Sequence, residues 1–140
     1  MKKLLLAGLV TTISTISMAT IKDRMTCTGV SERGFIKKLL IQMDDTKPFG
    51  KNMIANTTLL SGGTETTISV TDLGFESLPD GKRMKIHEDA EGRFYLYETT
   101  YGGNFQGVGA KHRQVILIEN ISSVPGINSN SWIEFLDCVK

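Results

Sequence analysis

The chain has 140 residues, two cysteines and a formal net charge of +1, and 40% of its residues are hydrophobic. This composition is typical of a single globular domain and excludes a collagen-like or low-complexity chain. A nearly neutral chain has no general electrostatic attraction to a nucleic-acid backbone or an anionic lipid surface, so we expect neither as a partner.

The first nineteen residues predict a cleaved signal peptide. Lys2 and Lys3 precede an apolar stretch over residues 4–10, and Ser17-Met18-Ala19 has the small-x-small pattern of a signal-peptidase site. A retained membrane anchor is the alternative, but the apolar stretch is shorter than the ~20 residues that a membrane span requires. We therefore expect residues 1–19 to be a signal peptide and residues 20–140 a single β-domain. The domain would be periplasmic or secreted in a bacterium, with no membrane insertion after cleavage.

Short apolar runs separated by turn residues predict antiparallel strands through most of the mature chain. In chain order, the expected strands are 35–43, 52–60, 64–71, 82–88, 93–100, 113–119 and 131–139. Ser61-Gly62-Gly63 predicts a tight hairpin between the second and third of these, because glycine adopts the positive φ that such turns need. In segment 64–71, Thr66, Ile68 and Val70 alternate with polar residues, which indicates one buried and one exposed face.

Three of these segments leave alternatives open. Residues 35–43 have apolar side chains at i, i+4 and i+8, which also suits a helix. Residues 131–139 begin with a possible capping box, Ser131 and Glu134, so a short helix is again the alternative. The run Val115-Ile116-Leu117-Ile118 in segment 113–119 fits a strand that is buried on both faces or lies at a tightly packed closure.

Cys27 and Cys138 lie near the two ends of the mature chain. An oxidising compartment favours a disulfide between them, and neither has the C-x-x-C spacing or neighbouring histidines of a redox or metal site. Pairing would place the first and last strands side by side. The sequence thus predicts an all-β fold, a small antiparallel up-and-down barrel or sandwich of about seven or eight strands whose N- and C-terminal strands are joined by a disulfide.

An aromatic strip and a glycine-rich segment are the candidate binding elements. Tyr95, Tyr97 and Tyr101 fall on one strand face, opposite Phe94 and Leu96. If the latter two point inward, the tyrosines form an outer strip that could bind protein or carbohydrate. The following segment, 101–110, surrounds Phe105 with four glycines, and this residue could serve as an aromatic anchor on a loop.

No motif in the sequence predicts catalysis, a cofactor or a metal site. His87 and His112 lack the spacing of metal ligands, and we interpret both as surface histidines. There is no G-x-S-x-G motif, and the two cysteines are expected to bind each other. An enzyme that uses His87 or His112 with nearby carboxylates remains a minor alternative.

The leading hypothesis is therefore a non-catalytic exported domain that binds a protein or carbohydrate partner through Tyr95, Tyr97, Tyr101 and Phe105. A second hypothesis is a carrier of an apolar ligand in an internal cavity. Its cavity would be lined by Ile68, Val70, Met84, Ile86, Phe94 and Leu96. The sequence does not indicate the oligomeric state.

Overall fold

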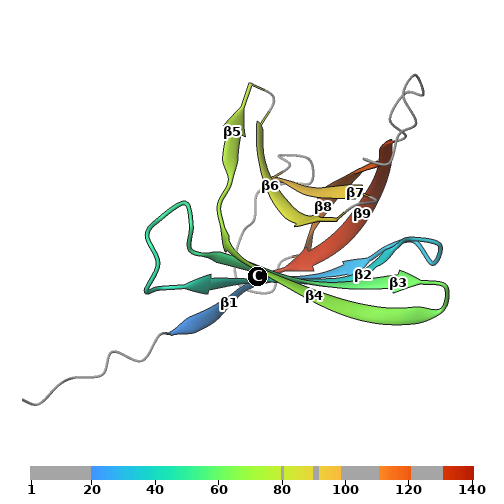
Figure 1. The fold of residues 1–140 in the computed structure, drawn as a ribbon, viewed down its shortest axis with the longest axis horizontal. Coiled ribbons are helices and arrows are strands. Elements are labelled where there is room, and N and C mark those ends of the chain that lie inside the picture. The colour runs from blue at the N-terminus through green and yellow to red at the C-terminus, as the bar shows by residue number, and fades with distance from the viewer. Residues whose placement is uncertain (1–19, 80, 90–91, 99–110, 121–130) are drawn as a thin grey trace, which may run out of the picture.

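A computed structural model describes residues 20–79, 81–89, 92–98, 111–120 and 131–140 of the chain, and these form one nine-stranded antiparallel sheet (Figure 1). The strands are β1 (Ile21–Gly29), β2 (Ile36–Asp44), β3 (Met53–Ser61), β4 (Thr64–Leu73), β5 (Glu76–Leu78), β6 (Gly81–Glu88), β7 (Gly92–Glu98), β8 (Lys111–Asn120) and β9 (Ser131–Val139). None of the described residues forms a helix of the length and apolarity that a membrane span requires.

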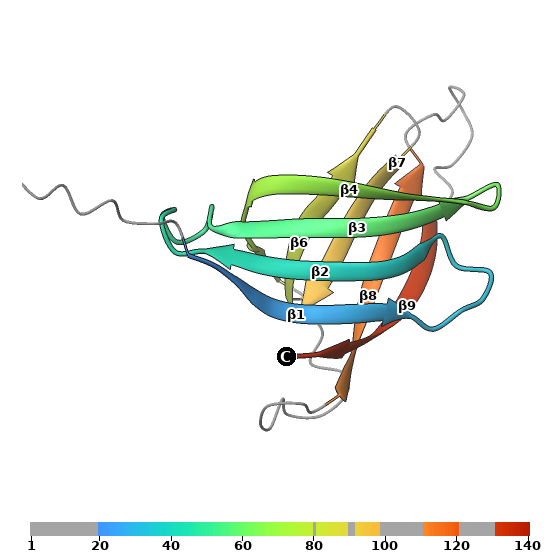
Figure 2. The same ribbon diagram turned by 90° about the horizontal axis from the view of Figure 1, so that it is seen from below.

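The two terminal strands lie side by side in the middle of the sheet. The strand order is β4-β3-β2-β1-β9-β8-β7-β6-β5, so β1 and β9 join an N-terminal half to a C-terminal half (Figure 2). Every other neighbouring pair is consecutive in sequence, as in an up-and-down barrel. The junction is short, because only Thr26–Gly29 of β1 pairs with β9, whereas β8 pairs with β9 from Lys111 to Glu119.

The sheet curls into a half-barrel because its two edge strands are consecutive in the chain. Only Gly74 and Phe75 separate β4 from β5, which lie at opposite edges of the sheet. Two linking residues span at most about 11 Å between the strand ends. The two edges must therefore lie close together where β4 ends and β5 begins. Figure 1 shows the two strands diverging from that point. A Cβ on Gly74 would lie 1.8 Å from the carbonyl oxygen of Gly50, so this crossing requires glycine.

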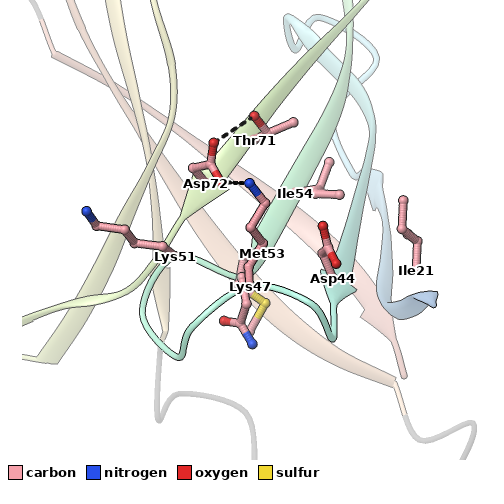
Figure 3. Close-up of a pocket in the computed structure, with 9 residues that line it drawn as sticks. Ile21, Asp44, Lys47, Lys51, Met53, Ile54, Thr71 and Asp72 are labelled. Carbon is pink, nitrogen blue, oxygen red and sulfur yellow. Dashed lines mark hydrogen bonds and ion pairs between the residues drawn. The ribbon is translucent and has the colours of Figure 1, made fainter. Parts of the chain in front are cut away.

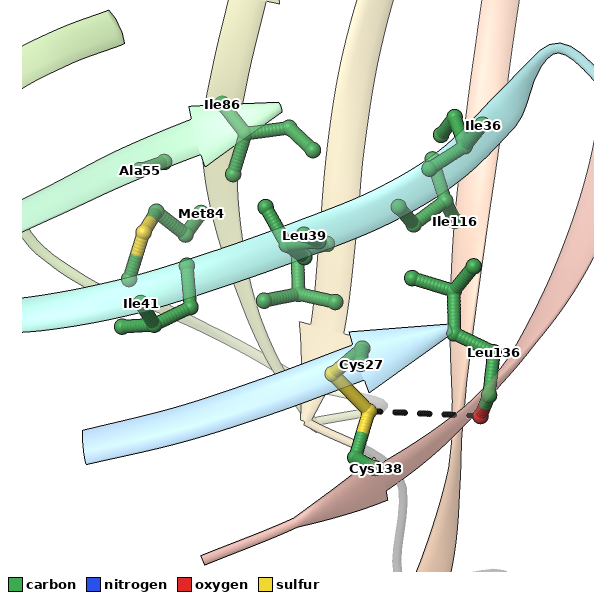
Figure 4. Close-up of a cluster of buried hydrophobic side chains, with 11 residues drawn as sticks. Cys27, Ile36, Leu39, Ile41, Ala55, Met84, Ile86, Ile116, Leu136 and Cys138 are labelled. Carbon is green, nitrogen blue, oxygen red and sulfur yellow. Dashed lines mark hydrogen bonds between the residues drawn. A yellow bond between two sulfur atoms is a disulfide. The ribbon is translucent and has the colours of Figure 1, made fainter. Parts of the chain in front are cut away.

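The core lies on the concave face, where the two halves of the sheet pack against each other. Figure 4 shows buried side chains from β1, β2 and β3 meeting those of β6, β8 and β9. The buried apolar residues are Cys27, Ile36, Leu39, Ile41, Ala55, Met84, Ile86, Leu96, Ile116, Leu136 and Cys138. Removal of this apolar surface from water stabilises the curled form of the sheet.

The predicted disulfide between Cys27 and Cys138 is present and closes the terminal pairing. The two cysteines are direct cross-strand neighbours in the β1–β9 ladder, and both are fully buried. They are 111 residues apart in sequence, so the bond restricts nearly the whole described chain in the unfolded state. A buried disulfide of this kind indicates an oxidising, extracellular environment.

The all-β architecture predicted from the sequence is confirmed, with changes in detail. Segments 35–43 and 131–139 are strands rather than short helices, because each pairs with strands on both sides. The short strand β5 was not predicted, since three residues are too few to show an alternation, and β1 was expected only as the strand that carries Cys27, without bounds. The prediction that segment 113–119 is buried on both faces is wrong in part: Ile116 is fully buried, but Val115 and Leu117 remain partly exposed on the outer face.

A buried carboxylate ties β9 to the connection between β1 and β2. Glu134 is only 4% exposed, and its two oxygens accept hydrogen bonds from the backbone N–H groups of Phe35 (2.6 Å) and Ile36 (2.9 Å). Gly34 packs against it, since a Cβ there would lie 2.8 Å from Oε2 of Glu134. The carboxylate therefore fixes the end of the β1–β2 connection, and Phe35 meets the ring of Trp132 edge-on at 6.0 Å.

We predict that Glu134→Ala lowers the free energy of unfolding by about 3 kcal/mol, because two inward-facing N–H groups lose a charged acceptor. The control is Asp137→Ala, which removes an exposed carboxylate from the same strand and should cost less than about 1 kcal/mol. Urea unfolding of both variants measures the difference. Equal losses would show that the contacts of Glu134 do not stabilise the connection.

Candidate functional site

Six apolar or aromatic side chains form a contiguous grid on the outer face of β7, β8 and β9. The ladder places Tyr97 opposite Val115, and Val115 opposite Phe135. Two residues further along each strand, the ladder places Tyr95 opposite Leu117 and Leu117 opposite Ile133, which forms a second row. The resulting set, which we term the outer apolar surface, consists of Tyr95, Tyr97, Val115, Leu117, Ile133 and Phe135.

The members of the outer apolar surface are accessible to solvent. Ile133 is 57% exposed and Phe135 is 49% exposed, and the other four are partly exposed. Their neighbours along the same strands, Leu96, Ile116 and Leu136, point into the core and are buried. This alternation shows that the grid is a second apolar face of the sheet rather than an extension of the core.

Arginines flank two of the aromatic rings. The guanidinium of Arg83 lies 4.8 Å from the ring centroid of Tyr95 and pairs with Glu76 at 3.6 Å. A hydrogen bond with the Tyr97 side chain raises the pKa of Arg83 above its usual value. On the other side, Arg113 lies 5.9 Å from the Phe135 ring centroid and pairs with Asp137 at 3.1 Å. These cation–π contacts hold the rings in defined positions.

A charged cluster borders the surface beyond the row that contains Tyr95. Glu88 is hydrogen-bonded to Lys85 and, at 2.9 Å, to Nε of Arg93. The hydrogen bond from Lys85 has the largest effect in lowering the pKa of the Glu88 carboxyl, and the hydrogen bond from Arg93 lowers it further. Because the acids and bases of the border pair with each other, the border is close to neutral around an apolar centre.

The outer face of the N-terminal half is more polar than that of β7–β9. Thr58 and Thr67 share a hydroxyl hydrogen bond of 2.9 Å across β3 and β4. A second series of bonds joins Asn56 to Gln42 (2.9 Å) and Gln42 to Asp23 (2.7 Å). Leu40, Ile54 and Leu60 lie on the same face and are partly exposed, but they alternate with these polar side chains and form no continuous apolar grid.

The structure places two of the four predicted binding residues in this surface. Leu96 is buried and Phe94 packs against the core, so Tyr95 and Tyr97 point outward as the alternation predicts. Tyr101 and Phe105 lie outside the described residues. Sequence reasoning missed Val115, Leu117, Ile133 and Phe135. The available signal was their apolar character at alternating positions, but only the strand register reveals that they adjoin the tyrosines.

His87 is not the surface residue that we expected. A bulge between Lys85 and His87 turns it toward the core side, where it is 9% exposed and meets the ring of Phe94 edge-on at 5.2 Å. Its Nε2 lies 3.0 Å from Oδ2 of Asp89, and Oδ1 of the same carboxylate accepts the Gly92 N–H at 2.8 Å. These contacts tie together the connection between β6 and β7.

The described residues contain neither a cluster of metal ligands nor a free thiol. No three histidine, cysteine, aspartate or glutamate residues among them lie close enough to hold a metal ion, and both cysteines are in the disulfide. His112 pairs with Cys138 in the β8–β9 ladder, and its side chain lies outside the described residues.

A hollow of about 240 Å³ lies where the β2–β3 connection meets the end of β4 (Figure 3). Lys47 contacts Asp72 there at 3.2 Å, and Asp44, Lys51 and Thr71 also line it. None of the six residues predicted to line an internal cavity belongs to this hollow. Three of those six, Met84, Ile86 and Leu96, are buried in the core.

Comparisons of the chain with protein-family models, with curated proteins and with solved structures found no match. The assignment of function therefore depends on the geometry of the outer apolar surface and its border.

We predict that Glu88→Gln destabilises the fold at pH 7 and that this difference disappears on acidification. A lowered pKa in the folded state means that the carboxylate contributes stability above its usual pKa of 4.5. That contribution is lost as the pH falls through the lower folded-state value. Thermal unfolding of both proteins between pH 7 and pH 2 measures the effect, and a difference that grows on acidification would contradict the assignment.

Proposed function

We propose that the chain is an exported, non-catalytic domain that binds a protein partner through the outer apolar surface. The observation that carries this proposal is the contiguous grid of six apolar and aromatic side chains on β7, β8 and β9. Single exposed apolar residues are normal on protein surfaces, whereas a contiguous patch with a polar border is typical of an interaction site.

The difference between the two halves of the sheet supports a binding role. Both halves bury one face in the core, and the outer face of the N-terminal half is mainly polar, with no continuous apolar grid. Solubility alone therefore does not require an apolar outer face on β7–β9. Tyrosine and phenylalanine supply large contact areas with few rotatable bonds, which lowers the entropic cost of binding.

The border favours a protein partner over a carbohydrate. Arg83, Lys85, Arg93 and Arg113 are each paired with a carboxylate of this chain, so the border carries little net charge, although their remaining N–H groups can still donate. Arg83 also lies against the ring of Tyr95, where a sugar would stack. A partner with an apolar surface requires none of these groups.

The proposed location is the periplasm or the exterior of the cell. The predicted signal peptide supports export, and the Cys27–Cys138 disulfide supports an oxidising compartment. The described residues offer no evident chemistry for catalysis, so we propose no enzymatic activity.

The test is binding by the immobilised mature chain, as wild type and as Ile133→Glu. Proteins captured from a periplasmic extract are identified and purified, and their affinity for each form is then measured by calorimetry. We expect Ile133→Glu to weaken binding at least tenfold, about 1.4 kcal/mol, because it replaces the most exposed side chain of the outer apolar surface with a charge. Tyr97→Ala should weaken it as well.

The matched control is Thr58→Glu, which places the same charge on the polar outer face and should leave the affinity within twofold. Unchanged affinity of both Ile133→Glu and Tyr97→Ala would contradict the proposal. Binding of purified glycans that Tyr97→Ala abolishes would show instead that the surface recognises carbohydrate.

A further inference from the structure

Arg83 lies next to the outer apolar surface, on the adjoining strand. The ladder places it opposite Tyr97 on one side and opposite Glu76 on the other, so its side chain leaves the sheet on the same outer face. The next residue, Met84, is fully buried on the inner face. A partner that covers the tyrosines would therefore also meet Arg83.

Aromatic side chains hold the guanidinium of Arg83 in position. It lies 4.8 Å from the ring centroid of Tyr95 and has a hydrogen bond with the Tyr97 side chain. The planar guanidinium matches the geometry of a carboxylate, and a group that is already oriented loses little conformational entropy when it binds. Arg83 is therefore prepared to bind an anion on the outer face.

The hydrogen bonding of Arg83 is incomplete in the free chain. Its Nε is enclosed by protein and has no hydrogen-bond partner among the described residues. The carboxylate of Glu76 lies 3.6 Å away, beyond hydrogen-bond distance, and its side chain is 72% exposed on a strand of only three residues. Enclosed donors without an acceptor are uncommon in proteins and call for an explanation.

The other cations on the border of the outer apolar surface differ from Arg83 in this respect. Glu88 accepts hydrogen bonds from Lys85 and Arg93, and Arg113 donates one of 3.1 Å to a neighbouring carboxylate. Among these four cations, Arg83 is the one whose contact with a carboxylate lacks a hydrogen bond. An acceptor from outside the chain would complete it.

We propose that Arg83 binds a carboxylate of the protein partner, and that this carboxylate competes with Glu76 for the guanidinium. The inference rests on the proposed function and adds a chemical requirement, because the partner must present a carboxylate beside the apolar side chains that cover the tyrosines. Arginine and a carboxylate form two parallel hydrogen bonds, which determine orientation as well as affinity. Glu76 is easily displaced, since exposed ion pairs contribute little stability.

The test uses two small probes of similar shape with the full mature chain, 3-phenylpropanoate and its neutral amide, 3-phenylpropanamide. The phenyl ring represents an apolar side chain of the partner, and only the first probe carries a carboxylate. NMR titration, followed at the side-chain signals of Arg83 and Tyr97, measures both affinities. We expect the wild type to bind the carboxylate about fivefold or more tightly than the amide, because charge-assisted hydrogen bonds are the stronger ones.

Two variants should shift this preference in opposite directions. Arg83→Gln should bind both probes equally. Glu76→Gln should bind the carboxylate about twofold to fivefold more tightly than the wild type, because it removes a weakly held competitor. A purely structural role of Arg83 does not predict tighter binding by Glu76→Gln.

The matched control is Lys22→Gln, which removes the same charge from an exposed ion pair with Asp45 in the N-terminal half and should keep the wild-type preference. Equal or undetectable binding of the two probes by the wild type would overturn the proposal. A Glu76→Gln variant that binds the carboxylate no more tightly than the wild type would overturn it as well.

The same variants separate this inference from the proposed function. On the captured protein, Arg83→Gln should weaken binding and Glu76→Gln should strengthen it. If Ile133→Glu weakens protein binding but the wild type does not distinguish the two probes, the outer apolar surface binds the partner and the inference about Arg83 is wrong. If the probes are distinguished but Ile133→Glu and Tyr97→Ala leave protein binding unchanged, Arg83 binds carboxylates and the proposed function is contradicted.

Discussion

The pairing of β1 with β9 is the constraint on which the rest of the structure depends. Every other neighbouring pair joins strands that are consecutive in the chain, so each half of the sheet can form from local connections. The two halves become one sheet only where Thr26–Gly29 meets Leu136–Val139, a short ladder of four residue pairs. The disulfide and the carboxylate of Glu134 both act at this junction: one links the strands covalently, and the other binds the backbone that leads into β2. The disulfide and the buried carboxylate therefore reinforce the sheet where its ladder is short.

This junction also determines what the domain can present to a partner. Strand β9 bonds to β1 on one side and to β8 on the other, and it supplies Ile133 and Phe135 to the outer apolar surface. The core side of the same strand carries Glu134, Leu136 and Cys138, all of them buried. Because buried groups fix the inner face of β9, the outward direction of its exposed apolar residues is fixed as well. For the proposed binding role, side chains whose directions are fixed in this way lose little conformational entropy on binding.

Local patterns in the sequence predicted a large part of this fold. Gly62-Gly63 predicted the hairpin, and the two cysteines predicted that the terminal strands are neighbours. The predicted buried face of segment 64–71 is wrong, because Thr66 is exposed and Ile68 and Val70 are only partly buried on this edge strand. Periodicity alone could not decide between strand and helix in 131–139, because Trp132, Phe135 and Leu136 suit both, and pairing with β1 and β8 determined the outcome. The outer apolar surface was predicted only for its tyrosines, since its other members become neighbours through a register between distant strands. The role of Glu134 was missed for the same reason, because the N–H donors that its carboxylate binds, those of Phe35 and Ile36, lie 99 and 98 residues away in sequence.

The most direct test of this account is the stability of the double variant Cys27→Ala/Cys138→Ala, measured by denaturant unfolding together with amide exchange. A loop of this length predicts a loss of about 4–5 kcal/mol in the free energy of unfolding. The amides of the β1–β9 ladder should then exchange faster than those in the middle of β3 and β7. A variant with wild-type stability, and with β1–β9 amides as protected as before, would show that the terminal pairing does not depend on the disulfide and would contradict the account.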